Sequence, residues 1–390
     1  MRTTALAAAA FAAAALLAPD DASAIPAFAR KHRVSCTTCH DPFPRLKPYG
    51  EEFAARGFAL EPGQEPPRAT LDVGDELLQL PRDFPIAVRM DGFAQWTPDS
   101  DPQTAFHAPW VFKILTGGKI ADRVSWYTYF ILEEGEVVGL EDAYVQFTGV
   151  FGLPVDLLPG QFTVSDPIVK RELRLTRLDY QILGVRPRAS DLDLTYDRGL
   201  MAAWHAPGEV EVVGQLLNGA GIGPCAGALC DGDKYKNGSL RVQRQFGPVR
   251  LGLFAYLGKQ EKAVAGPPAV NTTVVLGPDV AVHLGGLATL TALFLERRDS
   301  NAEFLAGGAR ETATRGGFAE LVVQPQGENG RLTLTALYNN VRSDDALAQR
   351  HSAAVSGSWL LARNVRLVGE VERDLEAEAW RLSVGTVLAY

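Results

Sequence analysis

The chain has 390 residues, with 46 acidic side chains against 38 lysines and arginines, and a formal net charge of -8 at pH 7. This balance argues against nucleic acid as a partner, because nucleic-acid-binding chains carry a basic patch or stripe. Mean hydropathy is close to zero and glycine is abundant, at 38 residues. Both features are typical of an exported barrel whose strands alternate apolar and polar side chains.

Residues 1–24 have the three parts of a secretory signal peptide. Arg2 supplies the positive start, an apolar run extends from Ala5 to Ala18, and Ala22-Ser23-Ala24 fits the small-residue cleavage pattern. The apolar run is too short to span a bilayer comfortably, and no later stretch has about eighteen consecutive apolar residues. We therefore expect an exported chain that begins near Ile25 and has no transmembrane helix.

The next feature is Cys36-Thr37-Thr38-Cys39-His40. Two cysteines at this spacing, followed directly by histidine, form the motif for covalent attachment of c-type haem. A disulfide and a zinc site are the alternatives, but zinc needs two further soft ligands and His32 is the one obvious addition. We predict one covalent c-type haem on Cys36 and Cys39, with His40 as the proximal ligand of the iron.

The predicted haem segment covers residues 25–60 and contains a helix from Pro48 to Arg56, with proline at its start and Gly57 after its end. Its apolar side chains are Phe43, Leu46, Tyr49, Phe53 and Phe58. A segment of roughly 35 residues is too small to bury enough surface to fold alone. We expect another wall to cover the haem, and residues 61–83 to be a linker to it.

Residues 84–390 alternate apolar and polar side chains, and this period of two is typical of strands. The last stretch, Trp380 to Tyr390, has the length of a tilted transmembrane strand and ends in an aromatic residue, as the last strand of outer-membrane barrels does. An edge strand of a soluble β domain is the alternative. We predict an all-β, porin-like, antiparallel transmembrane β-barrel of about sixteen strands, near residues 85–96, 110–120, 123–132, 139–148, 154–163, 195–205, 209–218, 238–246, 248–257, 278–285, 287–297, 315–324, 331–342, 351–361, 365–373 and 379–390.

Short turns and long connections alternate between these segments. The short turns lie near 121–122, 207–208, 247–248, 285–286, 325–330 and 363–364. The longer connections lie at 97–109, 164–194, 219–237, 258–277, 298–314 and 343–350. Outer-membrane barrels have short periplasmic turns and longer outer loops. We therefore expect the N-terminus in the periplasm, and an even number of strands places the C-terminus there as well.

A barrel of about sixteen strands leaves a channel unless something fills it. We infer that the haem segment plugs the periplasmic half of the lumen; a domain swinging freely beneath the barrel is the alternative. Lumenal side chains near that end are candidates for the sixth iron ligand: His205, His283 and Met201. Ordinary lumenal histidines are equally consistent with the pattern. His32, only four residues before Cys36, is an awkward candidate for the far face of the haem.

Three predicted lumenal arginines are candidates to pair with the haem propionates, because a guanidinium matches a carboxylate: Arg89, Arg198 and Arg241. They are equally consistent with a wet channel wall. The other two cysteines, Cys225 and Cys230, lie in a turn-rich loop and are expected to form a disulfide in an oxidising compartment, with a second metal site as the alternative. Acidic loop residues have the charge to attract cations, although solvated turns are the ordinary case: Glu133, Glu134, Glu136, Asp231 and Asp233.

The stretches from Pro26 to Arg30 and from Ser35 to Phe58 resemble the fused monohaem cytochrome–porins of the outer membrane, best known from iron-oxidising bacteria. That resemblance implies a short c-haem segment ahead of a barrel of about sixteen strands. It also implies that Cys36, Cys39 and His40 attach the haem and ligate its iron. The stretch from Ser165 to Tyr180 is similar to haem-tagged porins too, and is expected to be a solvated charged loop unless it folds inward.

The resemblance implies a function in electron transport. Electrons would pass from extracellular Fe(II) through one haem to a periplasmic c-type cytochrome, with lipid of the bacterial outer membrane around the barrel. If the chain is an enzyme, it is an electron-transfer oxidoreductase, because no hydrolase or transferase signature is present in the sequence. The alternatives are a haem-tagged porin whose plug gates solute passage, a conduit for another donor or acceptor, and a sensor whose haem binds NO or CO.

Overall fold

The computed structural model describes residues 27–32, 34–60, 70–71, 74, 80–81, 85–98, 100–134, 136–223, 230–264, 267–306 and 310–389. The expected signal peptide, 1–24, and most of the expected linker, 61–83, lie outside these residues. Within the described ranges, no helix has the length and apolar character needed to cross a membrane.

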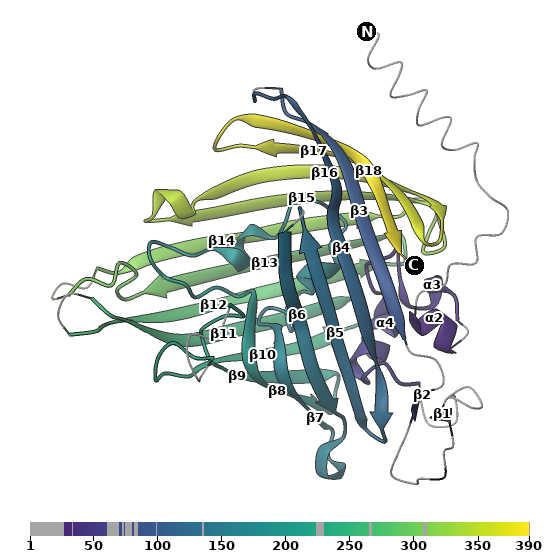
Figure 1. Ribbon diagram of the computed structural model, residues 1–390, viewed down its shortest axis with the longest axis horizontal. Helices are drawn as coiled ribbons and strands as arrows, with labels where there is room; N and C mark the ends of the chain where they lie inside the picture. Colours follow the sequence, from purple (N-terminus) through teal and green to yellow (C-terminus); the bar gives the residue numbers. More distant parts are fainter. Residues whose placement is uncertain are drawn as a thin grey trace.

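Sixteen antiparallel strands form a closed barrel (Figure 1). Each strand pairs with its neighbour along the chain, and the last strand closes the barrel on the first. The strands are β3 (Ile86–Trp96), β4 (Thr104–Ala121), β5 (Val124–Glu133), β6 (Glu136–Phe147), β7 (Val155–Thr163), β8 (Tyr196–Ala206), β9 (Val210–Leu217), β10 (Asn237–Phe246), β11 (Val249–Lys262), β12 (Ala269–Leu284), β13 (Ala288–Asp299), β14 (Thr312–Val323), β15 (Leu332–Ser343), β16 (Arg350–Ala362), β17 (Val365–Asp374) and β18 (Ala379–Ala389). The predicted porin-like barrel is confirmed.

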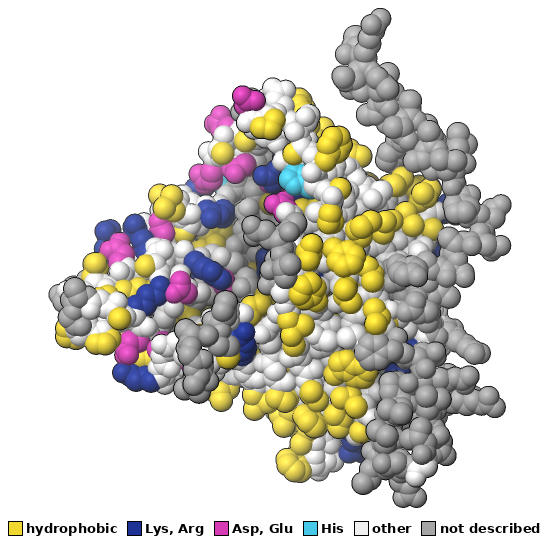
Figure 2. Space-filling model, viewed as in Figure 1, with side chains coloured by type: hydrophobic (Ala, Val, Ile, Leu, Met, Phe, Trp, Pro, Cys, Tyr) yellow, Lys and Arg dark blue, Asp and Glu magenta, His cyan; other side chains and the backbone are white. Residues whose placement is uncertain are grey.

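Side chains alternate between the lumen and an apolar outer belt. In β8, Leu200 and Trp204 are exposed on the outside, whereas Asp197 and Met201 point inward and are buried. Figure 2 shows the apolar side chains spread across the strands, with charged side chains gathered toward one end of the barrel. An apolar band around a polar interior is the surface that a lipid bilayer requires of a barrel.

Three strands are longer than the alternation predicted. β4 begins at Thr104 rather than near residue 110, β11 continues to Lys262 rather than ending near 257, and β12 begins at Ala269 rather than near 278. In their extensions Gln260 pairs with Asn271 and Lys259 with Thr272, so the ladder continues with polar side chains on both faces. The apolar signal stops at the edge of the belt, whereas backbone pairing continues past it.

The two ends of the barrel differ, and we call them the short-turn end and the long-loop end. The connections 122–123, 207–209, 247–248, 285–287 and 363–364 lie at the short-turn end, where β3 begins and β18 ends. Three helices also lie at this end (Figure 1): α2 (Ala27–His32), α3 (Cys36–Cys39) and α4 (Pro48–Ala55). The remaining elements are short: the strands β1 (Thr70–Leu71) and β2 (Leu80–Pro81), and the 3-10 helices η1 (Val150–Gly152), η2 (Arg171–Leu173), η3 (Gln181–Gly184) and η4 (Ala346–Ala348).

The connection 164–194, which we call the inward loop, folds into the lumen. The expectation of a solvated charged loop is wrong, because the loop's apolar side chains are buried against lumenal side chains: Val164, Ile168, Leu178, Ile182, Leu183 and Val185. Its polar groups bind the wall around most of the circumference. Tyr180 donates to Glu320 in β14, Leu178 N donates to Glu370 in β17, and Arg177 donates to Ser383 in β18. The inward loop therefore forms a partition across the barrel.

Candidate functional site

The Cys-x-x-Cys-His motif is held by the helices on either side of it. Ser35 caps α3 by accepting a hydrogen bond from Thr37 N. Lys47 N donates to the carbonyl of Cys39 at 3.0 Å, just before α4 begins. Gly50 lets α4 approach closely, since a Cβ there would lie 2.2 Å from the Cys39 oxygen. The motif is thus fixed by local packing as well as by its spacing.

The ring of His40 is oriented by its own loop. Its Nδ1 lies 3.0 Å from the carbonyl of Pro44 and 3.2 Å from that of Arg45. A proton on Nδ1 satisfies these acceptors and leaves the lone pair on Nε2, the arrangement that metal-ligating histidines use. Burial lowers the pKa of His40, which favours the neutral imidazole that a metal requires.

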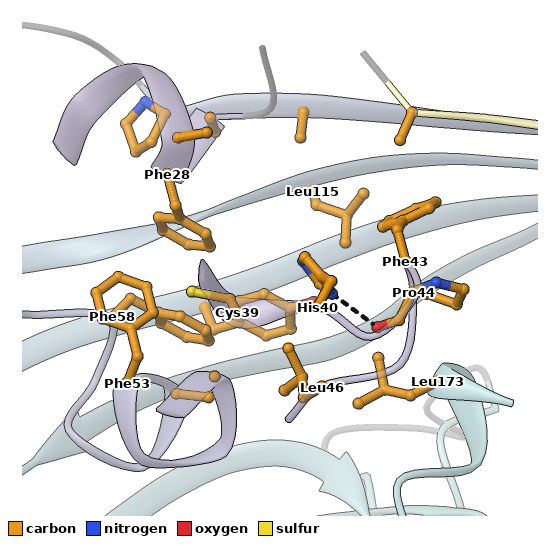
Figure 3. A pocket seen from close by; sticks show the side chains of 18 of the residues that line it. Phe28, Cys39, His40, Phe43, Pro44, Leu46, Phe53, Phe58, Leu115 and Leu173 are labelled. Carbon is orange, nitrogen blue, oxygen red and sulfur yellow. Dashed lines mark hydrogen bonds between the residues drawn. The ribbon is translucent and has the colours of Figure 1, made fainter. Parts of the chain in front are cut away.

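An apolar cavity surrounds these groups (Figure 3). It holds about 1550 Å³ of space not filled by protein atoms, including its open mouth. The N-terminal segment contributes most of one side, with Phe28, Cys36, Cys39, His40, Phe43, Leu46, Phe53 and Phe58. The barrel and the inward loop contribute the other, with Leu115, Tyr127, Tyr129, Tyr144 and Leu173.

Aromatic rings join the N-terminal segment to the barrel wall. Phe28 stacks on Phe58 with centroids 4.8 Å apart, and Phe58 stacks on Tyr127 of β5 at 5.0 Å. Phe53 meets Phe28 edge to face at 5.5 Å. Aromatic pairs of this kind add about 0.5–1.5 kcal/mol beyond the area that they bury. The barrel is therefore the covering wall that the small segment needs.

Polar contacts hold the same segment inside the short-turn end. Lys47 lies 3.6 Å from Glu328, in the turn before β15, and Glu51 lies 3.5 Å from Arg250 of β11. Asp41 accepts a hydrogen bond from Gln324, and the carbonyl of Ala55 accepts one from Gln146 of β6. These contacts reach strands on different sides of the barrel. The segment thus lies in the lumen as a plug.

Charged groups border the cavity on the side of the inward loop. Lys113 of β4 and Glu172 of η2 form an ion pair, and Lys113 lies 4.7 Å from the centroid of Tyr129. Asp166 and Lys170 also border the cavity. Burial raises the pKa of Asp166 to about 6. Beyond this border lies a small polar pocket that shares Lys113 and Glu172 and reaches Glu133 and Glu141.

The predicted sixth-ligand candidates lie elsewhere in the described structure. His205 hydrogen-bonds Asp156 at 3.1 Å and borders an open groove between α4 and the wall. His283 contacts Thr289, and Met201 belongs to the cluster beneath the inward loop. None of the three lines the apolar cavity as described. His32 does line it, although its position in the sequence argued against this.

The three candidate arginines lie in different parts of the barrel. Arg89 lines the cavity and pairs with Asp91 at 2.7 Å. Arg198 donates to the carbonyls of the connection after β9, at the long-loop end, and Arg241 pairs with Asp279 while donating to the inward loop. Arg89 is thus the arginine of the three that the structure brings to the cavity, beside Lys113 and Lys170.

The residues around the cavity fit a c-type haem. Two free thiols lie on its wall, a half-buried imidazole presents Nε2, and the lining is largely apolar. Cys36 and Cys39 would hold such a group covalently, and His40 would ligate its iron. Burial raises the pKa of both thiols, as expected for cysteines in an apolar surrounding.

Three of the five acidic candidates have structural partners in the described part of the chain. Glu134 lies 3.3 Å from His107, Asp231 pairs with Lys236, and Asp233 accepts from the Tyr235 and Glu261 amides. The described ranges hold no cluster of three or more histidine, cysteine or carboxylate side chains suited to a metal ion. Cys230 is disulfide-bonded, whereas Cys225, its expected partner, lies outside the described residues, and the side chain of Glu136 is not described.

The barrel is similar to solved structures of outer-membrane porins. An anion-selective porin from Comamonas acidovorans matches with a TM-score of 0.57 and 11% identity, over 78% of this chain and 98% of the porin. The outer membrane channel DcaP of Acinetobacter baumannii matches with a TM-score of 0.56 and 11% identity, over 79% and 97%. OmpF of Salmonella typhi matches with a TM-score of 0.54 and 11% identity, over 79% and 98%.

No protein-family model matches the chain, and no curated protein sequence matches it either. The likeness to the solved porins is one of fold, at an identity too low to carry a function. The chain thus has a closed, sixteen-stranded, porin-like barrel with short helices at its N-terminal side.

Proposed function

We propose that this chain is an outer-membrane electron-transfer protein with one c-type haem between its N-terminal segment and the barrel wall. The observation that carries the proposal is the apolar cavity into which Cys36, Cys39 and His40 open and which the barrel completes. By family resemblance the donor is extracellular Fe(II) and the acceptor a periplasmic c-type cytochrome. The short-turn end, where α2 lies and β18 ends, then faces the periplasm.

Haem, when bound, supplies reversible one-electron chemistry at its iron. The chain's own residues have the remaining roles. Cys36 and Cys39 tether the group, and His40 ligates it through Nε2. The apolar lining keeps water away, which tunes the reduction potential. Lys170 borders the cavity together with Arg89 and Lys113, which already pair with Asp91 and Glu172, and positive charge there would stabilise carboxylates of a bound group.

The first test is covalent attachment. The full chain, produced in a host with cytochrome c maturation, should carry one haem that survives denaturation, and the mass of the protein should rise accordingly. The double variant Cys36→Ser with Cys39→Ser should fold as a barrel and carry none. A wild-type protein without covalent haem, produced beside a control cytochrome that matures normally, would rule the proposal out.

The second test is transfer across a membrane. The protein is reconstituted into liposomes that enclose an oxidised c-type cytochrome, and Fe(II) is added outside. Each Fe(II) oxidised to Fe(III) outside should reduce one molecule of cytochrome inside. The double cysteine variant is the matched control. Equal rates for both proteins would contradict electron transfer through the haem.

The porin-like fold supports a second candidate, a porin whose plug gates solute passage. The neighbours include a porin described as anion-selective, and that property is theirs. Planar-bilayer conductance separates the candidates. The electron-transfer proposal expects few ions to pass, because the plug and the inward loop obstruct the lumen at two levels. A steady conductance of porin size would favour the second candidate.

A further inference from the structure

We propose that His32 supplies the second axial ligand of the haem iron, opposite His40. The inference rests on the proposed haem site and adds the coordination of that site. It concerns a side chain that the sequence pattern disfavoured and that the structure places on the same cavity as His40.

The position of His32 in the fold is fixed by its surroundings. It is the last residue of α2, its side chain is buried with 8% of its surface exposed, and it lines the apolar cavity. Its ring meets Phe53 edge to face, with centroids 5.3 Å apart and planes at 85°. Phe53 in turn packs on Phe58 and Phe28, so the same aromatic group holds both the imidazole and the plug.

α2 and α3 are separate helices, and Ser35 between them has extended backbone with φ -74° and ψ 153°, which weakens the objection based on sequence distance. Val34 N donates to the carbonyl of Ala29 at 3.2 Å, closing the end of α2. Ser35 then caps α3 as a separate helix. Four residues of continuous helix would hold His32 beside Cys36 on one face. Two helices joined by a turn allow the imidazole to face the cavity from a different direction.

The other candidate ligands around the cavity are weaker. Among the described residues that line it, His32 and His40 are the imidazoles, and no methionine is present. Lys113 is engaged by Glu172, and Tyr127 is stacked on Phe58. Imidazole is a good ligand for haem iron, and a neutral ring suits a buried apolar site. Among the side chains that line the cavity, His32 is therefore the one best suited to be the second iron ligand.

Two imidazole ligands give the site a testable character. The iron should be six-coordinate and low-spin in both oxidation states. Its reduction potential should be lower than that of a His/Met site, because methionine ligation raises the potential. Neither property depends on which donor or acceptor the protein uses.

The experiment uses the full haem-loaded protein in detergent, with absorption and electron paramagnetic resonance spectra of the ferric form. Wild type should show a low-spin signal typical of two histidines. His32→Ala should convert it to high-spin, bind CO in the ferrous form, and regain the low-spin spectrum when imidazole is added. His32→Met should raise the midpoint potential if the sulfur reaches the iron. The matched controls, His205→Ala and His283→Ala, should leave the wild-type spectrum unchanged.

Each outcome separates the inference from the proposed function. Wild type with covalent haem but a high-spin signal overturns the inference alone, without any variant. A low-spin spectrum retained in His32→Ala at equal haem content also overturns it. A shift to high-spin in His205→Ala or His283→Ala assigns the ligand to that residue instead. Wild type without covalent haem removes the proposed function, and the inference falls with it.

Discussion

Arg297 is the side chain through which the barrel wall holds the inward loop, and replacing it should release that loop. From β13 it donates to the carbonyls of Val185 and Leu192 at 3.0 and 2.6 Å and to the hydroxyl of Ser190 at 2.9 Å. It also forms a paired contact with Asp299, with Nε 2.7 Å from Oδ2. Arg297 and Asp299 are both buried.

The magnitude follows from these contacts. Arg297→Ala removes three hydrogen bonds between a charged side chain and the inward loop, and such a bond contributes about 1.5–3 kcal/mol. Asp299 lies in the same strand as Arg297 and also accepts from Asn271 and Thr273, at 2.8 and 2.6 Å, so we count only the bonds to the loop and take their total as about 3 kcal/mol. Since about 1.4 kcal/mol is a factor of ten, Arg297→Ala should raise the population of the released loop roughly a hundredfold.

Two measurements report the release. Hydrogen exchange of residues 164–194 in detergent should speed up, and brief openings should appear in planar-bilayer recordings. Arg298→Ala is the matched control, because the neighbouring Arg298 is exposed and pairs only with Glu296 among the contacts described. Equal exchange and equal conductance in the two variants would refute the view that Arg297 holds the partition in place.

Three further predictions concern the plug and the loop. Gly50→Ala should lower covalent haem content at equal barrel yield, because the new Cβ meets the Cys39 carbonyl at 2.2 Å; unchanged content would contradict this packing. Gly57→Ala should loosen the plug, because Gly57 has φ +68° and an added Cβ would lie 2.0 Å from Ser125 Oγ. Protease should then cleave residues 27–60 more readily. Adding Ser125→Gly should restore part of the protection. Burial raises the pKa of Asp166 to about 6, so its neutral form is the one that the folded loop favours. As pH rises through 6, Asp166 becomes charged while it is buried, and the inward loop should lose stability. The protection factors of the loop amides, which correct for the intrinsic pH dependence of hydrogen exchange, should therefore be higher at pH 4.5 than at pH 7.5. Asp166→Asn should reduce that difference, and an unaltered difference would exclude Asp166 as its source.

The barrel could be predicted from the sequence because its signal is local. Side chains at alternate positions of a strand face the same side, so Trp380, Leu382 and Val384 reveal β18 without knowledge of any other strand. The outer faces of all sixteen strands are suited to the same surroundings, which are lipid. Each strand therefore repeats the same alternation of apolar and polar side chains. Where strands rise above the apolar belt the pattern ends, which is why β11 and β12 were predicted too short.

The inward loop and the cavity could not be predicted in the same way, because their contacts join distant parts of the chain. Tyr180 meets Glu320 across 140 residues, and Arg177 meets Ser383 across 206. A charged stretch with scattered apolar residues has no period that distinguishes a solvated loop from a buried one. His32 was missed for a related reason: its place depends on a turn between two short helices, not on its spacing from Cys36.

Two obstructions in series bear on what can cross this barrel. The plug occupies the short-turn end beside an open groove along the wall, and the inward loop forms a partition beyond it. The apolar cavity lies between the two, and the polar pocket around Lys113 and Glu172 lies against the inward loop. A hydrated ion needs a continuous water-filled path and must pass both obstructions. An electron does not, because it crosses packed protein between a donor and an acceptor that lie close enough together. On the proposed function, a plug and a partition in series would lower ion conductance without preventing electron transfer, and the donor would have to approach the partition from the long-loop end.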